Sequence, residues 1–382
     1  MTNILKEKVL IVGAGLAGST IARTLAENDI KVFIIEKRNH VAGNAYDFLN
    51  SNEERIHKYG PHLLHCNKNS MGLIFLSRFT KWINYEHKVR ALLEDGRTTP
   101  LPINKKTLED IFDKNFSSEK HVKEFLDQLR NKEIVPTNTD ELFESNVGNY
   151  LANIFFRPYT KKMWGIDSKE LAVGVGARIP VRYNDDSRYF TDNFQALPKY
   201  GYTKMVEKML DHKNITIKLE TNFEKGMEKN FYHSFLCLPI DKFFDFKFGV
   251  LPYRSIIFEN RDEFGKDMDA PVINFTDNSK YTRKTQWDLL PNSKRSNNLY
   301  KTITYEIPCS MNQNPEEYYY PVQTKDSRKL YEKYKKVSKQ FKTITFCGRT
   351  GLFKYIDMIP AVNIHLKLAK DFLLKNQIKN VY

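Results

Sequence analysis

The hydrophobic pattern near the start of the chain predicts a strand, a glycine turn, a helix and a second strand. An apolar run over 8–12 leads into the glycine-rich turn 13–18, and the spacing of apolar residues over 19–28 is helical. A second apolar run over 30–35 ends at Glu36. This order is that of a βαβ unit, so we expect the chain to open with a Rossmann-like fold.

The middle of the chain is expected to be mainly helical. From about 70 to 150 the pattern is highly charged, and apolar residues recur at three- and four-residue spacing over 117–130 and from 139 to about 156. Three glycines in 165–178 (Gly165, Gly174 and Gly176) suit a lid that closes over a substrate. We therefore expect an inserted helical domain with a mobile substrate lid nearby.

The pattern changes to strands in the second half. Short β-like runs occupy 214–219 and 234–238, and residues 251–308 alternate as antiparallel strands do. A last strand over 343–347 precedes a closing helix over 361–374. The fold class is therefore α/β, with a discontinuous Rossmann-like cofactor domain, an inserted helical domain and an antiparallel β-sheet domain. The expected limits are 1–76 with 200–245 and 335–382, then 77–150, and finally 151–199 with 246–334.

Composition narrows the class of partner. The chain has 60 Lys and Arg against 46 Asp and Glu, which gives a net charge of +14 and favours polyanions or nucleotide-bearing substrates. The lysines are spread along the sequence without a nucleic-acid-binding fingerprint, so no nucleic-acid partner is expected. The four cysteines form no CxxC pair, so no metal site is expected. The sequence shows no signal core or integral membrane segment, which favours the cytoplasm.

The glycine turn has the spacing G-x-G-x-x-G. Gly13 permits a tight turn, Gly15 admits a pyrophosphate against the backbone, and Gly18 lets the helix pack close to the strand. Glu36 ends the second strand, where a carboxylate can accept hydrogen bonds from ribose hydroxyls and would repel a 2′-phosphate. These features predict a dinucleotide site.

Two further segments favour FAD over NAD. Gly43 and Asn44 follow the second strand, and Gly348-Arg349 follows the C-terminal strand. A strand that ends in Gly-Arg before a helix can close over flavin phosphates and ring. We therefore expect FAD as the cofactor.

An ordered set of segments over almost the whole chain resembles the bacterial UDP-galactopyranose mutases. The segments are Tyr59-Gly-Pro-His-Leu-Leu-His65, Leu101-Pro-Ile-Asn104, the stretch 155–165, Arg178-Ile-Pro-Val-Arg182, Tyr189-Phe190, the stretch 194–202, Leu251-Pro-Tyr-Arg254, Tyr281-Thr-Arg283, Tyr319-Tyr-Pro321 and Gly348 to Met358. Each segment is nondescript by itself, whereas the ordered set is highly specific.

The resemblance implies an isomerase that interconverts UDP-galactopyranose and UDP-galactofuranose for surface polysaccharide biosynthesis. In this family, reduced FAD attacks the anomeric carbon through its N5 atom and expels UDP, so that a flavin-bound sugar can reopen and reclose. The implied partners are a UDP-hexose substrate, an external reductant such as NAD(P)H, and a second copy of the chain in a homodimer.

The resemblance also assigns site residues. Arg178 and Arg283 match a clamp on the diphosphate leaving group, with Arg182 as a nearby competitor of Arg178. The other implied catalytic residues are His65, Tyr320, Tyr355 and Glu306. The implied substrate-binding residues are Phe155, Tyr159, Thr160, Trp164, Tyr189, Asn274 and Arg182. Beside the residues named above, the cofactor side includes His62, Asp357 and Met358.

Several positions depart from the family pattern, which leaves the sugar open. They are the Leu-Leu-His-Cys run 63–66, His87, Leu238, Gln286 and the Ile-Pro pair 359–360. UDP-N-acetylgalactosamine, or another nucleotide-linked 6-deoxy or 2-acetamido sugar, is an alternative substrate. An FAD-dependent oxidoreductase of the amine oxidase type and a non-catalytic flavin-binding protein are the alternatives from other functional classes.

Overall fold

A five-stranded parallel sheet organises the first domain. The computed structural model describes residues 8–176, 180–295, 299–315 and 317–377 of the chain. The strand order is β10-β2-β1-β11-β17, all parallel. The strands are β10 (Ile215–Lys218), β2 (Lys31–Ile35), β1 (Lys8–Val12), β11 (His233–Leu236) and β17 (Ile344–Phe346). Segments from the start, middle and end of the chain therefore meet in one sheet, and the predicted discontinuous Rossmann-like fold is confirmed.

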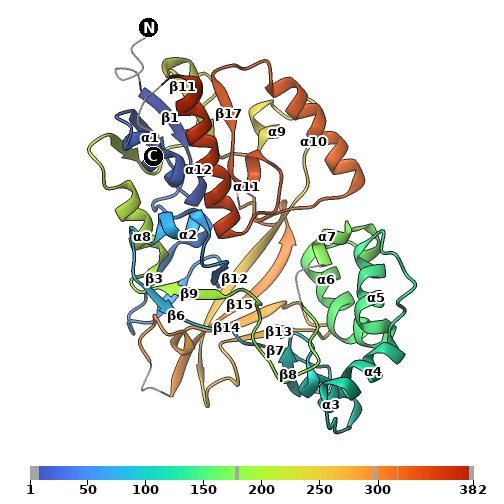
Figure 1. Ribbon diagram of the computed structural model, residues 1–382. Coiled ribbons are helices and arrows are strands. Elements are labelled where there is room, and N and C mark those ends of the chain that lie inside the picture. Colours follow the sequence, from blue (N-terminus) through green and yellow to red (C-terminus); the bar gives the residue numbers. More distant parts are fainter. Residues whose placement is uncertain (1–7, 177–179, 296–298, 316, 378–382) are drawn as a thin grey trace.

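Helices cover both faces of this sheet (Figure 1). Val9 and Ile11 of β1 belong to the core on the side of α1 (Leu16–Ala26), α8 (Gly201–Leu210) and α12 (Met358–Lys375). Leu10 and Val12 point to the other face, where α9 (Ile240–Phe243) and α10 (Lys325–Ser338) supply apolar side chains. A strand that is buried on both faces reads as a continuous apolar run, which is why its sequence signal is strong.

The second large sheet of the molecule has seven strands. Its order is β16-β12-β15-β14-β13-β7-β8, antiparallel except for the β13–β7 pair. The strands are β16 (Tyr320–Pro321), β12 (Tyr253–Phe264), β15 (Tyr300–Ser310), β14 (Arg283–Gln286), β13 (Val272–Phe275), β7 (Val89–Leu92) and β8 (Thr98–Leu101). The antiparallel strands predicted within 251–308 are confirmed.

The prediction that residues 70–150 are mainly helical is wrong for part of that range. Residues 82–101 contain β6 (Trp82–Asn84), β7 and β8. In β7, Val89 and Ala91 are buried while Arg90 and Leu92 are only half-buried. Such a two-residue period is too short in a four-residue strand to compete with a longer helical pattern nearby.

The helical domain begins at residue 105. It contains α3 (Lys105–Phe112), α4 (Glu119–Leu129), α5 (Thr139–Leu151), the π-helical turn η3 (Ala152–Phe156), α6 (Arg157–Trp164) and α7 (Val173–Gly176). Asn104, Ser118 and Asn138 cap α3, α4 and α5 by accepting hydrogen bonds from backbone amides. The helices bury Leu108, Val122 and other apolar side chains in a core of their own.

Two cations fasten α6 to the large sheet. Lys162 Nζ donates to the carbonyl oxygens of Phe275 and Tyr281, at 2.9 and 2.7 Å. Arg254 Nε donates to the carbonyl oxygen of Met163 at 2.9 Å, near the end of α6. The helix that carries several predicted substrate residues is therefore fixed relative to β13 and β14.

The remaining elements include two small sheets, one of β3 and β4 and one with the order β5-β9-β6. The elements are β3 (Asp47–Leu49), β4 (Arg55–His57), β5 (Leu64–Cys66), α2 (Met71–Leu76), β9 (Phe194–Pro198) and α11 (Gly348–Gly351), with short 3₁₀ turns at Gly43–Ala45, Ser168–Glu170, Met227–Asn230 and Trp287–Leu289. Within the described ranges, no helix combines the length and apolar character needed to cross a bilayer.

Two buried histidines make the stability of this fold depend on pH. Burial lowers the pKa of His57 and of His87 to about 3, and nearby arginine charge lowers each further. Below their ordinary value of 6.5, these histidines take up protons in the unfolded chain but stay neutral in the folded chain until near pH 3. The stability that these two neutral histidines contribute is therefore fully present above about pH 6.5 and is lost as the pH falls from there toward 3.

We expect the free energy of unfolding to fall by about 3 kcal/mol between about pH 6.5 and pH 5 from these two groups. Urea unfolding at both pH values measures this loss. The variant His57→Gln should show a loss that is smaller by about 1.5 kcal/mol, because one of these two groups is removed, whereas His121→Gln, at an exposed position, should leave the loss unchanged. An unchanged pH dependence in His57→Gln contradicts the assignment.

Gly148 allows α4 and α5 to pack closely. Its φ of +81° suits glycine, and a Cβ added there would lie 2.0 Å from the carbonyl oxygen of Leu129. We expect Gly148→Ala to destabilise the helical domain by about 3 kcal/mol or more, measured by urea unfolding. Gly174→Ala is the matched control, because a Cβ at that position meets no atom within 4 Å.

Candidate active site

A cavity of about 640 Å³ opens at the carboxyl ends of the parallel strands. Ligands of doubly wound folds bind at this edge. Residues that follow β1, β2, β11 and β17 line it, and ten of the predicted cofactor residues are among them. These ten are Gly13, Gly15, Gly18, Glu36, Gly43, Asn44, His62, Gly348, Arg349 and Met358.

The glycine turn forms a cradle with no room for side chains. A Cβ on Gly18 would lie 2.0 Å from the carbonyl oxygen of Gly13, and a Cβ on Gly43 would lie 2.9 Å from the Cα of Gly15. Gly13 has a φ of +103°, which favours glycine. The turn into α1 therefore presents backbone at these glycines on the cavity wall, and this fits the pyrophosphate of a dinucleotide.

Glu36 is a fixed carboxylate on the same wall. Its Oε2 accepts a hydrogen bond from the Ala14 amide at 2.8 Å, and its Oε1 accepts one from the Arg38 amide at 3.0 Å. Each oxygen keeps a second acceptor position for a ribose hydroxyl. Asn44 Oδ1 accepts from Arg38 Nη1 at 3.1 Å, so Asn44 also orders the loop after β2.

The C-terminal turn is held by a residue that the sequence analysis missed. Gly348, with a φ of +70°, donates its amide hydrogen to Nε2 of the buried His365 at 2.9 Å. Nδ1 of His365 lies 2.6 Å from the Ala361 carbonyl oxygen, so this nitrogen carries the proton. The only sequence signal was a histidine on the apolar face of the closing helix. Arg349 donates to the carbonyl oxygens of Tyr319 and Ile356, both at 3.0 Å.

His62 lies where the cavity approaches the second sheet. Its amide donates to Nδ1 of His57 at 3.0 Å, and its own Nδ1 lies 2.8 Å from the Gly60 carbonyl oxygen. Burial, then the neighbouring His57, lower the pKa of His62 to about 3. The imidazole is therefore neutral, with its proton on Nδ1 and Nε2 available as an acceptor. Of the remaining cofactor predictions, Asp357 precedes α12 as its N-cap.

Arg283 and Glu306 form a buried ion pair beside this cavity. They are directly opposite on β14 and β15, and Arg283 Nη2 donates to Glu306 Oε2 at 2.8 Å. The Glu306 side chain is 1% exposed and that of Arg283 is 23% exposed. Burial raises the pKa of Glu306 and Arg283 counters this rise. The guanidinium is therefore a partly accessible cation with a carboxylate behind it.

Predicted aromatic residues surround this cation. Burial, then the adjacent Tyr355, raise the pKa of Tyr320 to about 12, while the charges of Arg283 and Arg349 lower it. The rings of Tyr320 and Tyr355 are stacked with centroids 5.5 Å apart, and Trp164 meets Tyr320 edge-on at 6.1 Å. Burial also raises the pKa of Tyr159, and the charge of Arg283 opposes that rise. The structure thus brings Tyr159, Tyr320, Tyr355 and Trp164 to one side of the sheet.

The other residues predicted on the uridine side are more deeply placed. Asn274, 5% exposed, pairs with Arg283 across β13 and β14. Thr160 is 6% exposed, and Phe155 is 1% exposed within the core of the helical domain. Phe155 therefore packs within the helical domain, and Asn274 lies beside the ion pair in the sheet.

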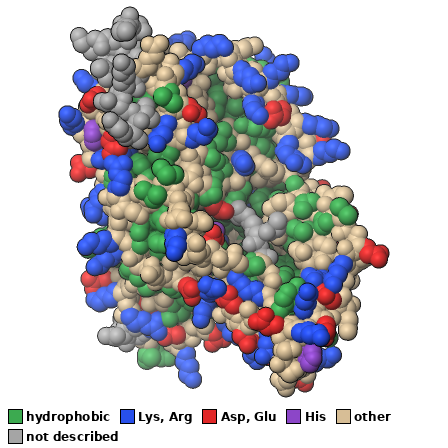
Figure 2. All heavy atoms as spheres, in the orientation of Figure 1, with side chains coloured by type: hydrophobic (Ala, Val, Ile, Leu, Met, Phe, Trp, Pro, Cys, Tyr) green, Lys and Arg blue, Asp and Glu red, His purple; other side chains and the backbone are tan. Residues whose placement is uncertain are grey.

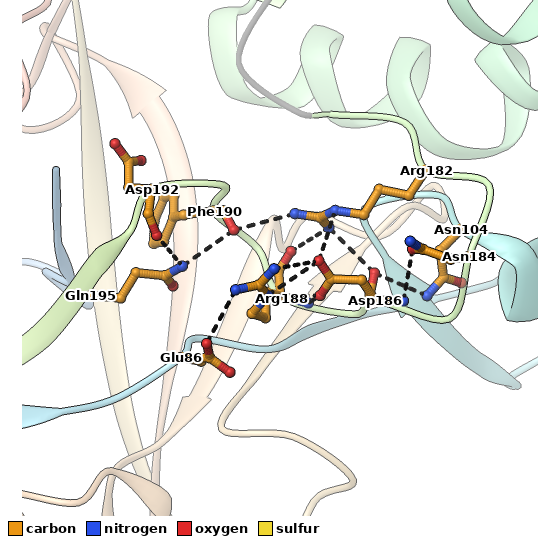
Figure 3. A network of polar contacts seen from close by, with 9 residues as sticks. All are labelled: Glu86, Asn104, Arg182, Asn184, Asp186, Arg188, Phe190, Asp192 and Gln195. Atoms are coloured by element: carbon orange, nitrogen blue, oxygen red, sulfur yellow. Dashed lines mark hydrogen bonds and ion pairs between the residues drawn. The ribbon is translucent and has the colours of Figure 1, made fainter. Parts of the chain in front are cut away.

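The Arg182 side chain binds the loop that follows it. Figure 3 shows its guanidinium among the backbone of residues 186–190, where it donates to Phe190 O at 3.2 Å and pairs with the Asp186 carboxylate at 3.4 Å. Tyr189, another predicted substrate residue, donates its amide to the carbonyl oxygen of His87 at 2.7 Å in the same loop. Arg182 thus orders the loop that carries Tyr189. Arg178 lies outside the described residues.

His65 faces the same loop. Its Nδ1 lies 2.8 Å from Asp192 Oδ2, and its ring stacks on that of Phe190 with centroids 3.7 Å apart. Among the positions that depart from the family pattern, His87 lies against Tyr189 and near the charge of Arg283. Gln286, in contrast, donates to the carboxylates of Asp267 and Asp288 at 2.8 Å each, so its side chain links structural segments of the second sheet. Of these two positions, His87 is therefore the one that lies on the substrate side.

Comparison with known proteins points to one family. The UDP-galactopyranose mutase profile matches residues 154–355, and an NAD(P)-binding Rossmann-like profile matches residues 11–75. A probable UDP-galactopyranose mutase of Klebsiella pneumoniae is 34% identical over 96% of this chain and 95% of its own length. A dTDP-fucopyranose mutase of Escherichia coli is 31% identical over 97% and 99% of the two chains.

Solved structures share the fold. A crystal structure of reduced UDP-galactopyranose mutase matches with a TM-score of 0.74 and 17% identity, over 98% of both chains. A redesigned putrescine oxidase matches with a TM-score of 0.58 and 11% identity, over 97% of this chain and 99% of its own. At these identities the likeness concerns the fold alone, whereas the sequence relatives and the matched profile show the family. The chain belongs to the UDP-galactopyranose mutase family.

Proposed function

We propose that the chain binds FAD in the cavity of the parallel sheet and, with the flavin reduced, interconverts UDP-galactopyranose and UDP-galactofuranose. The observation that carries this proposal is the position of Arg283. It is a partly exposed guanidinium, backed by a buried carboxylate and surrounded by tyrosines, next to the wall that includes His62. A mutase needs a cation of this kind, because UDP leaves the anomeric carbon with added negative charge.

The proposed cofactor residues fit a flavin dinucleotide. The bare glycine cradle would hold the pyrophosphate, Glu36 the adenosine ribose, and the Gly348 turn the opposite side of the cofactor. Reduced flavin, when bound, supplies the nucleophile that displaces UDP from the anomeric carbon. His62, neutral and with Nε2 free to accept, would receive a hydrogen bond at the flavin side of the sugar pocket.

The substrate would lie between α6 and the tyrosine cluster. Tyr159 would stack on the base, and Arg283 would bind the diphosphate together with Arg178. Burial raises the pKa of Tyr320 to about 12, so this hydroxyl keeps its proton at neutral pH and would donate to a phosphate oxygen. The hydroxyl of Tyr355, whose ring stacks on that of Tyr320, would donate to a second one. Glu306 would hold the guanidinium in place until the diphosphate binds it.

A 6-deoxy sugar linked to dTDP is the second candidate substrate. Its support is the relative that is named a dTDP-fucopyranose mutase and is 31% identical over 97% of this chain. His87 also stands on the substrate side at a position where the family pattern usually differs. We further propose that an external reductant such as NAD(P)H reduces the flavin and that the enzyme is a cytoplasmic homodimer. Its product would serve the synthesis of a surface polysaccharide.

Arg283→Ala is expected to lower kcat/KM at least about 100-fold, because one preorganised cation on the leaving group is lost. The protein should still retain FAD, since Arg283 lies on the second sheet rather than in the glycine cradle. Steady-state turnover and the flavin absorbance of the purified variant measure the two effects. Turnover within a few-fold of that of the unmodified protein would remove Arg283 from the clamp.

The reaction is tested with dithionite-reduced protein and three substrates: UDP-galactopyranose, UDP-N-acetylgalactosamine and dTDP-fucopyranose. We expect a furanose product from the first, separated by anion exchange, without consumption of oxygen or an electron acceptor. A product from dTDP-fucopyranose alone would favour the second candidate. Substrate oxidation with uptake of oxygen would overturn the mutase proposal.

A further inference from the structure

The fold gathers cations that are scattered in the sequence onto one surface. Residues 325–342, which are α10 and the turn after it, contain eight Lys and Arg side chains and two carboxylates, all exposed. The cations are Lys325, Arg328, Lys329, Lys333, Lys335, Lys336, Lys339 and Lys342, and the carboxylates are Asp326 and Glu332. Eighteen residues thus supply six units of the net charge of +14. Figure 2 shows Lys and Arg side chains along the edge where α10 lies in Figure 1.

The orientation of α10 is fixed by its opposite side. Tyr334 is fully buried in the core, and its hydroxyl donates to the carbonyl oxygen of Gly249 at 2.7 Å. The amide of Phe248 donates to the same hydroxyl at 3.0 Å. The helix therefore keeps its apolar side against the core, and the cations face outward.

Exposed apolar side chains lie beside this row. Phe246 is 41% exposed and Val250 is 53% exposed, in the loop that packs against Tyr334. Phe341, 39% exposed, lies just beyond α10 and meets Phe243 edge-on at 5.7 Å. Lys247 of the same loop is exposed as well. We define the basic face as residues 325–342 together with the loop 245–250.

We propose that the basic face docks the protein onto the anionic headgroups of a lipid bilayer. Clusters of four to eight lysines on one surface are attracted to anionic lipid, and neighbouring apolar side chains can enter the interface between headgroups and acyl chains. A nucleic acid fits less well. Seven of the eight cations are lysines, which act as point charges and lack the planar guanidinium that binds backbone phosphates bidentately.

The binding to lipid stands without the proposed function, whereas the biological role of that binding rests on it. A furanose donor for a surface polysaccharide is consumed by a transferase that builds an envelope polymer, and docking would release the product near that reaction. The basic face lies on α10 and the loop against it, which pack on the parallel sheet, whereas Arg283 lies on β14 of the second sheet. Its Phe246 also lines the cofactor cavity, so the test variants leave that residue unchanged.

The test is co-sedimentation of the FAD-loaded protein with vesicles of phosphatidylcholine that contain about 30% phosphatidylglycerol. We expect binding that weakens strongly between about 0.1 M and about 0.5 M salt. The triple variant Lys329→Glu/Lys333→Glu/Lys336→Glu should lower the partition coefficient on the order of 100-fold. Val250→Ser should lower it by up to roughly tenfold, because less apolar surface enters the interface.

The matched control is Lys120→Glu/Lys123→Glu/Lys213→Glu, which changes the net charge equally at exposed positions elsewhere. It should keep most of the binding. The proposal would be overturned by equal losses in both triple variants or by an absence of binding to anionic vesicles. Binding to duplex DNA is measured with the same variants, and a defect that appears only there would also overturn the proposal. Mutase turnover in lipid-free solution should be the same in all variants. A protein with no mutase activity that still bound vesicles through α10 would separate this inference from the proposed function.

Discussion

The carboxylate of Glu306 imposes the constraint on which the site depends. A buried carboxylate is costly unless a cation accompanies it, and truncation of one partner of such a pair typically costs about 3–5 kcal/mol. Arg283 is that cation, directly across the β14–β15 ladder. On its other side, Glu306 Oε1 approaches the turn before His62, where a Cβ on Gly60 would lie 2.9 Å from it. One carboxylate therefore holds the cation and leaves no room for a side chain at Gly60 in the histidine turn.

In the proposed function, the two sheets contribute different parts of one site. The parallel sheet contributes a backbone cradle, which suits a permanently bound dinucleotide. The large sheet and α6 contribute side chains with charge and rings, which suit a ligand that enters and leaves. Lys162 and Arg254 tie α6 to strands of the large sheet, so the aromatic side of the site is set by the sheet rather than by the helical domain alone.

The features predicted best from the sequence were those encoded locally. Gly13 and Glu36 belong to one short segment whose turn and strand lengths dictate their positions, and the buried strands read as continuous apolar runs. The strands within 82–101 were missed because four-residue strands show too little of their period. The family resemblance supplied most site residues, but not their partners. Arg182 donates to the carbonyl oxygen of Phe190, and Gly348 donates to His365. Both hydrogen bonds join groups that come together only in the folded chain.

The order of strands in the parallel sheet has a consequence for how the chain is made. Val9 of β1 pairs with His233 of β11, and Ser234 of β11 pairs with Ile344 of β17. The first strand leaves the ribosome long before its neighbour on this side exists, roughly 10 to 50 s earlier at ordinary rates of synthesis. During that interval an apolar strand edge has no partner, and such edges attract other chains. Nascent chains of this protein should therefore need protection by a chaperone until residue 346 has emerged.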